Sequence, residues 1–161
     1  MIQRVQTIYM LASVIAILTM HFFPLVTYAL PEATFELNSL GLVSLTPEFA
    51  AAGHFCLDLF LLLLVMVALP LVIIFLYKKR KLQLHMLIYT AVLDLCYYGL
   101  FFWRASQVSG EVFALSTSKV LDESYNYMML FMPALSIFCL IMAMRGVIYD
   151  IALLKSLDRL R

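Results

Sequence analysis

Two long apolar segments joined by a block of basic residues constrain this chain more than any other feature. The segments cover residues 55–77 and 82–103, and the block between them is Lys78, Lys79, Arg80 and Lys81. Each segment is close to the roughly 20 apolar residues that a helix needs to cross a bilayer. Four adjacent charges are too costly to bury in hydrocarbon, and basic loops stay on the cytoplasmic side. The pattern therefore predicts a transmembrane hairpin with a cytoplasmic turn.

The composition indicates that the rest of the chain is membrane-embedded as well. The 161 residues are 65% hydrophobic and 13% charged, whereas soluble domains have about 45–50% apolar and about 25% charged residues. Too few polar side chains remain to solvate a globular surface. We therefore predict one integral membrane domain over residues 1–161, with no separate soluble module.

Two further apolar runs complete a predicted all-α, four-helix transmembrane bundle. The expected helices are 5–26, 55–77, 82–103 and 127–148, with outer loops 27–54 and 104–126 and a cytoplasmic tail 149–161. The first run is longer than the roughly 7–15 apolar residues of a signal peptide, so we expect it to be an uncleaved helix. The tail is expected to extend the fourth helix.

The distribution of charge predicts that both chain ends are cytoplasmic. The residues expected to determine topology are Arg4, Lys78, Lys79, Arg80, Lys81 and Arg145. Six of the 10 acidic residues lie in the two loops on the other side: Glu32, Glu36, Glu48, Glu111, Asp122 and Glu123. This asymmetry follows the positive-inside rule.

The outer loops contain signals for a small β-element. Residues 34–45 carry short alternating apolar runs around turn-forming residues at 38–41, which is typical of two strands joined by a turn. A lone hairpin is marginally stable in water, so it needs further partners. Val112, Phe113 and Leu115 in the second outer loop are a candidate for an additional strand.

Asp94 is the most informative polar residue inside a predicted helix. It lies twelve residues past Leu82, or about 18 Å along the helix, slightly beyond the middle of a roughly 30 Å hydrocarbon core. The matching depth on the fourth helix falls near Ser136, and Ser13 or Thr19 on the first helix are within a turn of it. Asp94 is therefore either a proton or cation relay, a contact to another subunit, or a carboxyl group hydrogen-bonded to a hydroxyl that keeps the helices in register.

His21, His54 and Asp58 are candidate metal ligands near the predicted outer face. His54 and Asp58 are four residues apart, so on a helix they share a side, and His21 lies near the outer end of the first helix. Three such ligands could hold zinc or copper. Interfacial polar residues of this kind are also common without a metal, so we predict no metal and no other cofactor.

Motifs of known enzyme classes are missing from the sequence. It contains no G-x-G-x-x-G, P-loop, H-E-x-x-H or G-x-S-x-G pattern. Cys56, Cys96 and Cys139 form no C-x-x-C pair, and we expect them to be buried free thiols. The basic blocks are too short and lack the interleaved aromatic residues of a nucleic-acid surface. We therefore predict no catalytic or cofactor-binding residues, and a protein that is more consistent with a non-enzyme.

Three stretches together resemble a known family. They are the opening MIQRVQTIY (1–9), the turn YKKRKLQL (77–84) and the close LDRLR (157–161). The chain resembles, over essentially its whole length, the small four-pass inner-membrane proteins of Gram-negative bacteria catalogued as domain of unknown function forty-two ninety-three (DUF4293). The resemblance implies a four-helix membrane fold in the bacterial inner (cytoplasmic) membrane. It implies no activity and no catalytic residues.

Three functional hypotheses remain open at this point. The first is a non-enzymatic accessory or structural subunit that binds a larger membrane complex or another copy of itself, because large apolar helix faces occur without a catalytic motif. The second is a small transporter or ion-coupled protein that uses Asp94. The third is a metal-dependent membrane enzyme built on His21, His54 and Asp58. The expected partners are the lipid bilayer and a membrane protein or a second copy, and not nucleic acid.

Overall fold

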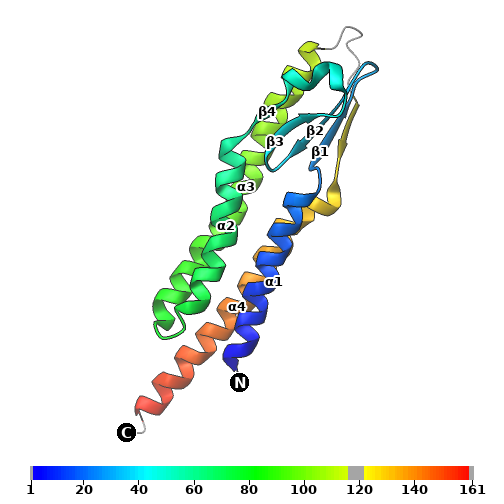
Figure 1. The fold of residues 1–161 in the computed structure, drawn as a ribbon. Helices are drawn as coiled ribbons and strands as arrows, with labels where there is room; N and C mark the ends of the chain where they lie inside the picture. The colour runs from blue at the N-terminus through cyan, green and yellow to red at the C-terminus, as the bar shows by residue number, and fades with distance from the viewer. Residues whose placement is uncertain (1, 116–121, 160–161) are drawn as a thin grey trace.

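The described residues, 2–115 and 122–159, form four long helices and a five-stranded antiparallel sheet in this computed structural model (Figure 1). The helices are α1 (Ile2–Phe22), α2 (Leu57–Phe75), α3 (Arg80–Leu115) and α4 (Tyr127–Arg159). All four are long and apolar enough to cross a membrane. Their outward surfaces are apolar too: Phe75 on α2 is 80% exposed and Tyr127 on α4 is 79% exposed. Helices that are apolar on all sides are typical of a membrane protein.

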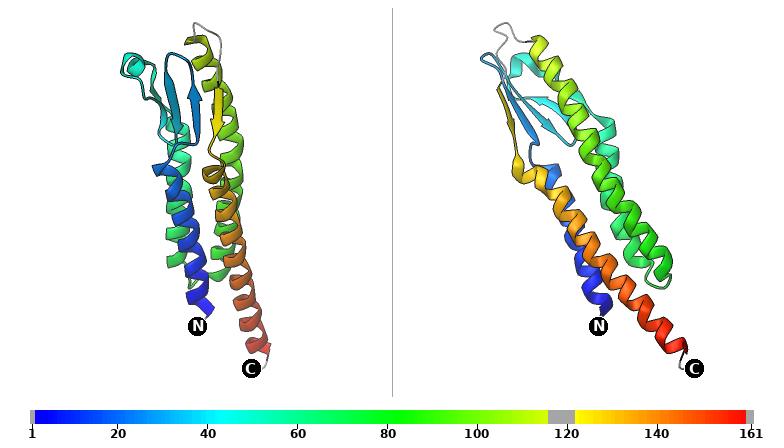
Figure 2. Two further views of the ribbon diagram at one scale, coloured as in Figure 1. Left: turned by 90° about the vertical axis from the view of Figure 1, so that its right-hand side faces the viewer. Right: turned by 180° about the vertical axis from the view of Figure 1, so that it is seen from behind.

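The helices run roughly parallel or antiparallel to one another, with α1 beside α4 and α2 beside α3 (Figures 1 and 2). Both chain ends and the turn between α2 and α3 lie at one end of the molecule, which we call the terminal end. The sheet lies at the opposite end, which we call the sheet end. The last part of α3 continues past the other helices and runs alongside the sheet (Figure 2).

The sheet contains strands from two connections, the one between α1 and α2 and the one between α3 and α4. Its strands are β1 (Val26–Ala29), β2 (Thr34–Asn38), β3 (Gly41–Ser44), β4 (His54–Phe55) and β5 (Asp122–Tyr125). Their order across the sheet is β4-β3-β2-β1-β5, so β1 pairs with both β2 and β5. A 3-10 helix, η1 (Pro47–Ala52), connects β3 to β4.

One face of the sheet packs against the end of α3. Side chains alternate between the faces of a strand, and Tyr28, Phe35 and Leu37 accordingly have no exposed surface. They share an apolar cluster with Val108 and Val112 of α3. The Tyr28 hydroxyl donates a hydrogen bond of 3.0 Å to the Ala105 carbonyl, which ties β1 directly to α3. Burial raises the pKa of Tyr28 and keeps this donor in place.

The structure confirms the four helices and the small antiparallel sheet that the sequence predicts. The two strands expected within residues 34–45 are β2 and β3. The prediction for Val112, Phe113 and Leu115 is wrong, because all three belong to α3. Val108 and Val112 are four residues apart, so on a helix both lie on the side that packs against the sheet. Their burial stabilises a helix at this position. The second outer connection does contain a strand, but it is the polar strand β5.

Several element boundaries also differ from those predicted. The first helix ends at Phe22 instead of 26, because the following residues pair with β2 and β5 as strand β1. The second begins at Leu57 instead of 55, because His54–Phe55 pairs with β3. The third spans Arg80–Leu115 instead of 82–103, so much of the expected outer loop 104–126 is helical. The fourth continues from 148 to Arg159, so the described part of the tail extends α4 as expected.

Candidate functional site

Two apolar clusters fill the interior, and buried polar residues lie between them. In α1, Met10 belongs to the cluster at the terminal end and Ile17 to the cluster at the sheet end. In α3 and α4 as well, the residues of one cluster lie toward the terminal end and those of the other toward the sheet end. The buried polar residues between the clusters are 1% exposed or less, and we call them the polar layer: Ser13, Thr90, Asp94 and Ser136. The layer lies about midway along the apolar parts of the helices.

Asp94 and Ser136 form a direct contact inside this layer. The Ser136 hydroxyl donates a hydrogen bond of 2.6 Å to Asp94 Oδ2, and this bond joins α4 to α3. The second carboxyl oxygen, Asp94 Oδ1, has no hydrogen-bond partner among the described residues. The structure thus brings together the two residues that helix depth alone places at the same level.

The two alternative hydroxyl partners on the first helix are used differently. Ser13 donates to the Met10 carbonyl at 2.8 Å, and Thr19 donates to the Ile15 carbonyl at 2.8 Å. Both bonds stay within α1. Such bonds to a preceding carbonyl are the usual way for a helical serine or threonine to satisfy its hydroxyl in an apolar setting. Neither residue is needed to hold Asp94.

Tyr98, one turn after Asp94 on α3, forms a second polar link to α4 that the sequence analysis missed. Its hydroxyl donates to the Leu130 carbonyl at 2.6 Å and accepts from the Ala134 amide at 3.1 Å. In a regular helix these two backbone groups bond to each other. Pro133 lies between them, and the tyrosine hydroxyl is inserted into the opened backbone ladder. In the sequence, Pro133 within the predicted fourth helix is the feature that indicates this gap in the backbone hydrogen bonds.

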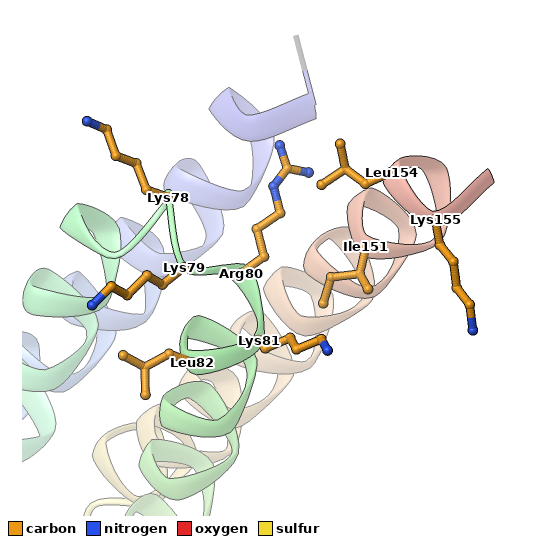
Figure 3. Close-up of a pocket in the computed structure, with 8 residues that line it drawn as sticks. All are labelled: Lys78, Lys79, Arg80, Lys81, Leu82, Ile151, Leu154 and Lys155. Atoms are coloured by element: carbon orange, nitrogen blue, oxygen red, sulfur yellow. The ribbon is translucent and has the colours of Figure 1, made fainter. Parts of the chain in front are cut away.

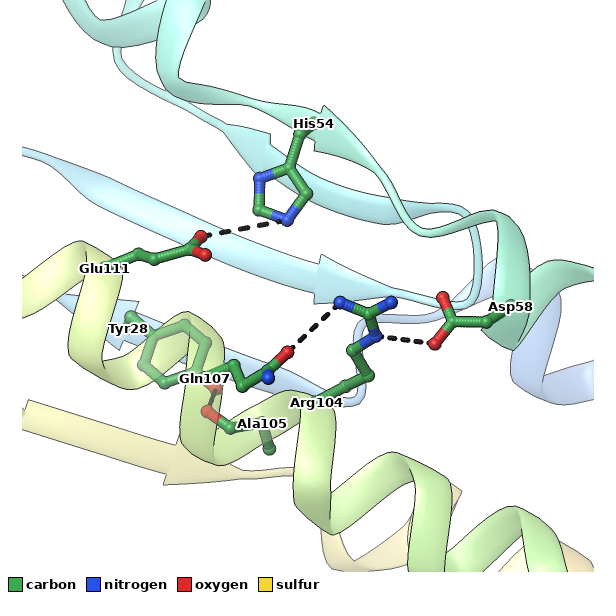
Figure 4. A network of polar contacts seen from close by, with 7 residues as sticks. All are labelled: Tyr28, His54, Asp58, Arg104, Ala105, Gln107 and Glu111. Carbon is green, nitrogen blue, oxygen red and sulfur yellow. Dashed lines mark hydrogen bonds and ion pairs between the residues drawn. The ribbon is translucent and has the colours of Figure 1, made fainter.

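A charged network lies at the sheet end, where α2 begins and α3 passes the sheet (Figure 4). Arg104 Nε donates to Asp58 Oδ2 at 2.5 Å and joins α3 to α2, while Arg104 Nη1 donates to Gln107 Oε1 at 3.1 Å. His54 Nε2 lies 3.9 Å from Glu111 Oε2 on the exposed side of the network. The sequence predicts that Arg104 begins the second outer loop, and a loop position gives no reason to expect Asp58 as its partner.

The three candidate metal ligands do not come together. His54 lies in strand β4 and not on a helix, so its spacing from Asp58 no longer places the two on one side. His21 Nδ1 is 3.1 Å from the Ser39 hydroxyl, and Asp58 is paired with Arg104. Across residues 2–115 and 122–159 the structure shows no group of three histidine, cysteine, aspartate or glutamate side chains that could hold a metal ion.

The cysteines are free, but only Cys56 and Cys139 are buried as predicted. Burial raises the pKa of the Cys56 thiol, which is typical of a packing residue. Cys96 is exposed on the outside of α3. The prediction of burial is wrong for Cys96, because an apolar helix also carries apolar residues on its outward-facing surface.

A third polar cluster ties three helices together at the terminal end. Arg80 Nη1 lies 3.0 Å from Asp150 Oδ2, and Gln6 Nε2 donates to the same oxygen at 3.0 Å. The Asp150 side chain is 8% exposed. Gly146, one turn earlier on α4, leaves the space that Gln6 occupies. Arg80 therefore serves as a helix-joining residue as well as a member of the basic block.

Comparison with protein-family models gave a match over almost the whole chain. A family model described as "Domain of unknown function (DUF4293)" matches residues 2–160, which include all four helices and the whole sheet. A comparison with curated proteins found no match. The matched description states no activity, so the chemistry of the chain has to be argued from its own residues.

Proposed function

The chain belongs to the DUF4293 family, and from its structure we propose that it is a multi-pass integral membrane protein acting as a non-enzymatic accessory or structural subunit. Its partner is a larger membrane complex or another copy of itself. The fold matches the membrane class that the composition predicts, with four long apolar helices and a sheet at one end.

The observation that carries the proposal is that three acidic side chains, which could otherwise serve in catalysis, each join two helices. Asp94 links α3 to α4 through Ser136, Arg104 links α3 to α2 through Asp58, and Asp150 links α4 to α3 through Arg80. An active site instead presents such groups to a substrate in a shared cavity. These groups lie in three separate places along the molecule, so they favour a structural role.

The lengths and charges of the elements support a membrane placement. Helix α2 has 19 residues, so its length of about 28 Å is close to the hydrocarbon thickness of a bilayer. The basic turn and both chain ends lie at the terminal end, and the acidic strand β5 lies at the sheet end. We therefore place the terminal end in the cytoplasm and the sheet outside the bacterial inner membrane, on the positive-inside rule.

Isolation from native membranes tests the proposal. The full chain carrying a C-terminal tag is extracted in a mild uncharged detergent, and the complex is weighed by native mass spectrometry. We expect a defined species that contains either one membrane-protein partner in fixed ratio or a second copy of the chain. An unrelated four-pass protein with the same tag is the control for non-specific capture. A strictly monomeric species would contradict the proposal.

A second candidate, an ion-coupled membrane protein that uses Asp94, is favoured by one observation. Asp94 has no exposed surface, and its Oδ1 has no partner among the described residues. An ionisable group in a membrane span whose hydrogen bonding is only partly satisfied is costly, and such groups commonly mark ion or proton pathways.

Substitution of Asp94 separates the two candidates. Asp94→Asn keeps the shape and the acceptor for Ser136 but removes the titratable carboxyl, so an accessory subunit keeps full growth complementation and an ion-coupled protein loses it. Ser136→Ala is the complementary control, because it removes the hydrogen bond that Asp94→Asn keeps and leaves the carboxyl group in place. Asp94→Leu removes the acceptor and is expected to lower stability by about 1 kcal/mol. The measurements are complementation of a deletion strain and thermal unfolding in detergent.

A further inference from the structure

The terminal end contains a cavity whose lining combines positive charge with apolar surface. The cavity has a volume of about 800 Å³ and lies between the start of α3 and the last turns of α4 (Figure 3). Its lining residues are Lys78, Lys79, Arg80, Lys81, Leu82, Ile151, Leu154 and Lys155. We propose that this cavity binds an anionic phospholipid, with the phosphodiester headgroup at the basic turn and an acyl chain against the apolar residues.

Among the described side chains, few carboxylates balance the positive charge of the cavity lining. Among the side chains that the structure describes, Asp150 is the carboxylate that pairs with a lining residue, Arg80. Asp150 is almost fully buried and also holds Gln6. No ion pair is found for the four lining lysines within the described residues. A phosphate group would supply the missing counter-charge through charge-assisted hydrogen bonds.

The apolar part of the lining distinguishes a lipid from a free anion. Leu82 of α3 and Ile151 and Leu154 of α4 line the same cavity as the cations. Leu82 and Leu154 are 45% and 47% exposed, so they present apolar surface that only an apolar ligand would cover. Inorganic phosphate would use the cations and leave this surface in water, whereas a phospholipid covers both parts. The volume is in the range of roughly 300–1,000 Å³ that is usual for small-molecule sites.

The position in the fold agrees with this occupant. The inference rests on the membrane placement proposed above, which puts the terminal end at the cytoplasmic surface. Anionic lipids give that surface a negative potential, and basic pockets between transmembrane helices bind their headgroups. Arg80 is also the first residue of α3, where the helix dipole favours a negative group.

The side-chain directions provide a charge-matched control. Arg80 and Lys81 extend on the side of the turn that faces α4, while Lys78 and Lys79 extend away from α4 (Figure 3). Lys78 Nζ lies 5.9 Å from the centre of its neighbour's ring, Tyr77. Removing Lys81 and Lys155 therefore affects the cavity between α3 and α4. Removing Lys78 and Lys79 takes away the same charge on the other side of the turn.

Lipid titration of the full chain in uncharged detergent tests the proposal. The ligands are phosphatidylglycerol, phosphatidylcholine, inorganic phosphate and a short acidic peptide, and binding is measured by native mass spectrometry and thermal unfolding. We expect phosphatidylglycerol to bind at least about tenfold more tightly than phosphatidylcholine, and phosphate to have no effect. The double variant Lys81→Gln, Lys155→Gln is expected to lose about tenfold or more of this affinity. The double variant Lys78→Gln, Lys79→Gln removes the same charge from lining residues whose side chains extend away from α4, so it is expected to lose clearly less affinity than Lys81→Gln, Lys155→Gln.

Four outcomes overturn the lipid inference. Equal binding of the two lipids removes the preference for anionic headgroups, and equal stabilisation by phosphate assigns the cavity to a free anion. Equal losses of lipid affinity in both double variants would show that binding depends on general surface charge and not on this cavity. Binding of an acidic peptide without any preference for phosphatidylglycerol assigns the cavity to a protein partner. Protease access to a C-terminal tag from outside intact cells would instead contradict the membrane placement itself, so the two failures are distinguishable.

Discussion

Gly41→Ala is expected to unfold the sheet end of the protein and to lower its stability by about 3 kcal/mol or more. Gly41 has a φ angle of +142°, which side-chain-bearing residues rarely adopt, and forcing such a conformation costs about 1–3 kcal/mol. An added Cβ would also overlap the His54 carbonyl oxygen and the Cys56 amide nitrogen. Strand β4 and the start of α2 would have to move away from β3. The measurements are denaturant unfolding in detergent, followed by the fluorescence of Trp103, and proteolysis of residues 30–52.

Two other glycines serve as controls for this substitution. A Cβ at Gly99 or Gly110 meets no atom within 4 Å, and both residues lie inside helix α3. Alanine is favoured over glycine in a helix by about 1 kcal/mol. Gly110→Ala is therefore expected to leave stability unchanged or to raise it slightly. Wild-type stability of Gly41→Ala would show that β3 and β4 do not pair as described.

Asp150→Leu is expected to produce the second largest loss, about 2–3 kcal/mol, at the terminal end. The substitution leaves the Arg80 guanidinium and the Gln6 amide without their shared acceptor. Removing one member of a fully buried ion pair costs about 3–5 kcal/mol, and Arg80 is 26% exposed, so part of that cost is recovered by water. The measurement is denaturant unfolding of the full chain in an uncharged detergent.

A double-mutant cycle shows whether this loss comes from the pair itself. If it does, the variant Arg80→Leu, Asp150→Leu is more stable than the sum of the two single losses predicts, because no unpaired charge remains. Arg145→Gln is the control, since Arg145 is exposed on the same helix and is expected to change stability by less than about 0.5 kcal/mol. Additive single losses would mean that Arg80 and Asp150 act independently.

The sequence was sufficient for the helices because their signal is long and local. About 20 apolar residues in a row identify a membrane helix without knowledge of its neighbours. Asp94 and Ser136 could be matched for the same reason, since depth along a straight helix follows from a fixed rise per residue. Their contact also required the correct rotation of both helices, which the depth argument does not specify.

The features that the sequence analysis missed depend on contacts between distant segments. Strand β5 is polar and exposed, so it has no hydrophobic alternation, and its pairing with β1 defines it as a strand. The end of α3 is helical because Val108 and Val112 pack against the sheet. The partners of Asp58 and Asp150 are Arg104 and Arg80, each far away along the chain. No local pattern predicts such pairs.

The central position of β1 has a consequence for biosynthesis. Strands β1 to β4 all precede α2 in the chain, but β5 follows α3 and closes the other side of β1. In the proposed placement, β5 reaches β1 only after α3 has crossed the bilayer. Closure of the sheet is therefore a late step of insertion, and resistance of this region to an external protease reports that the third span has been translocated.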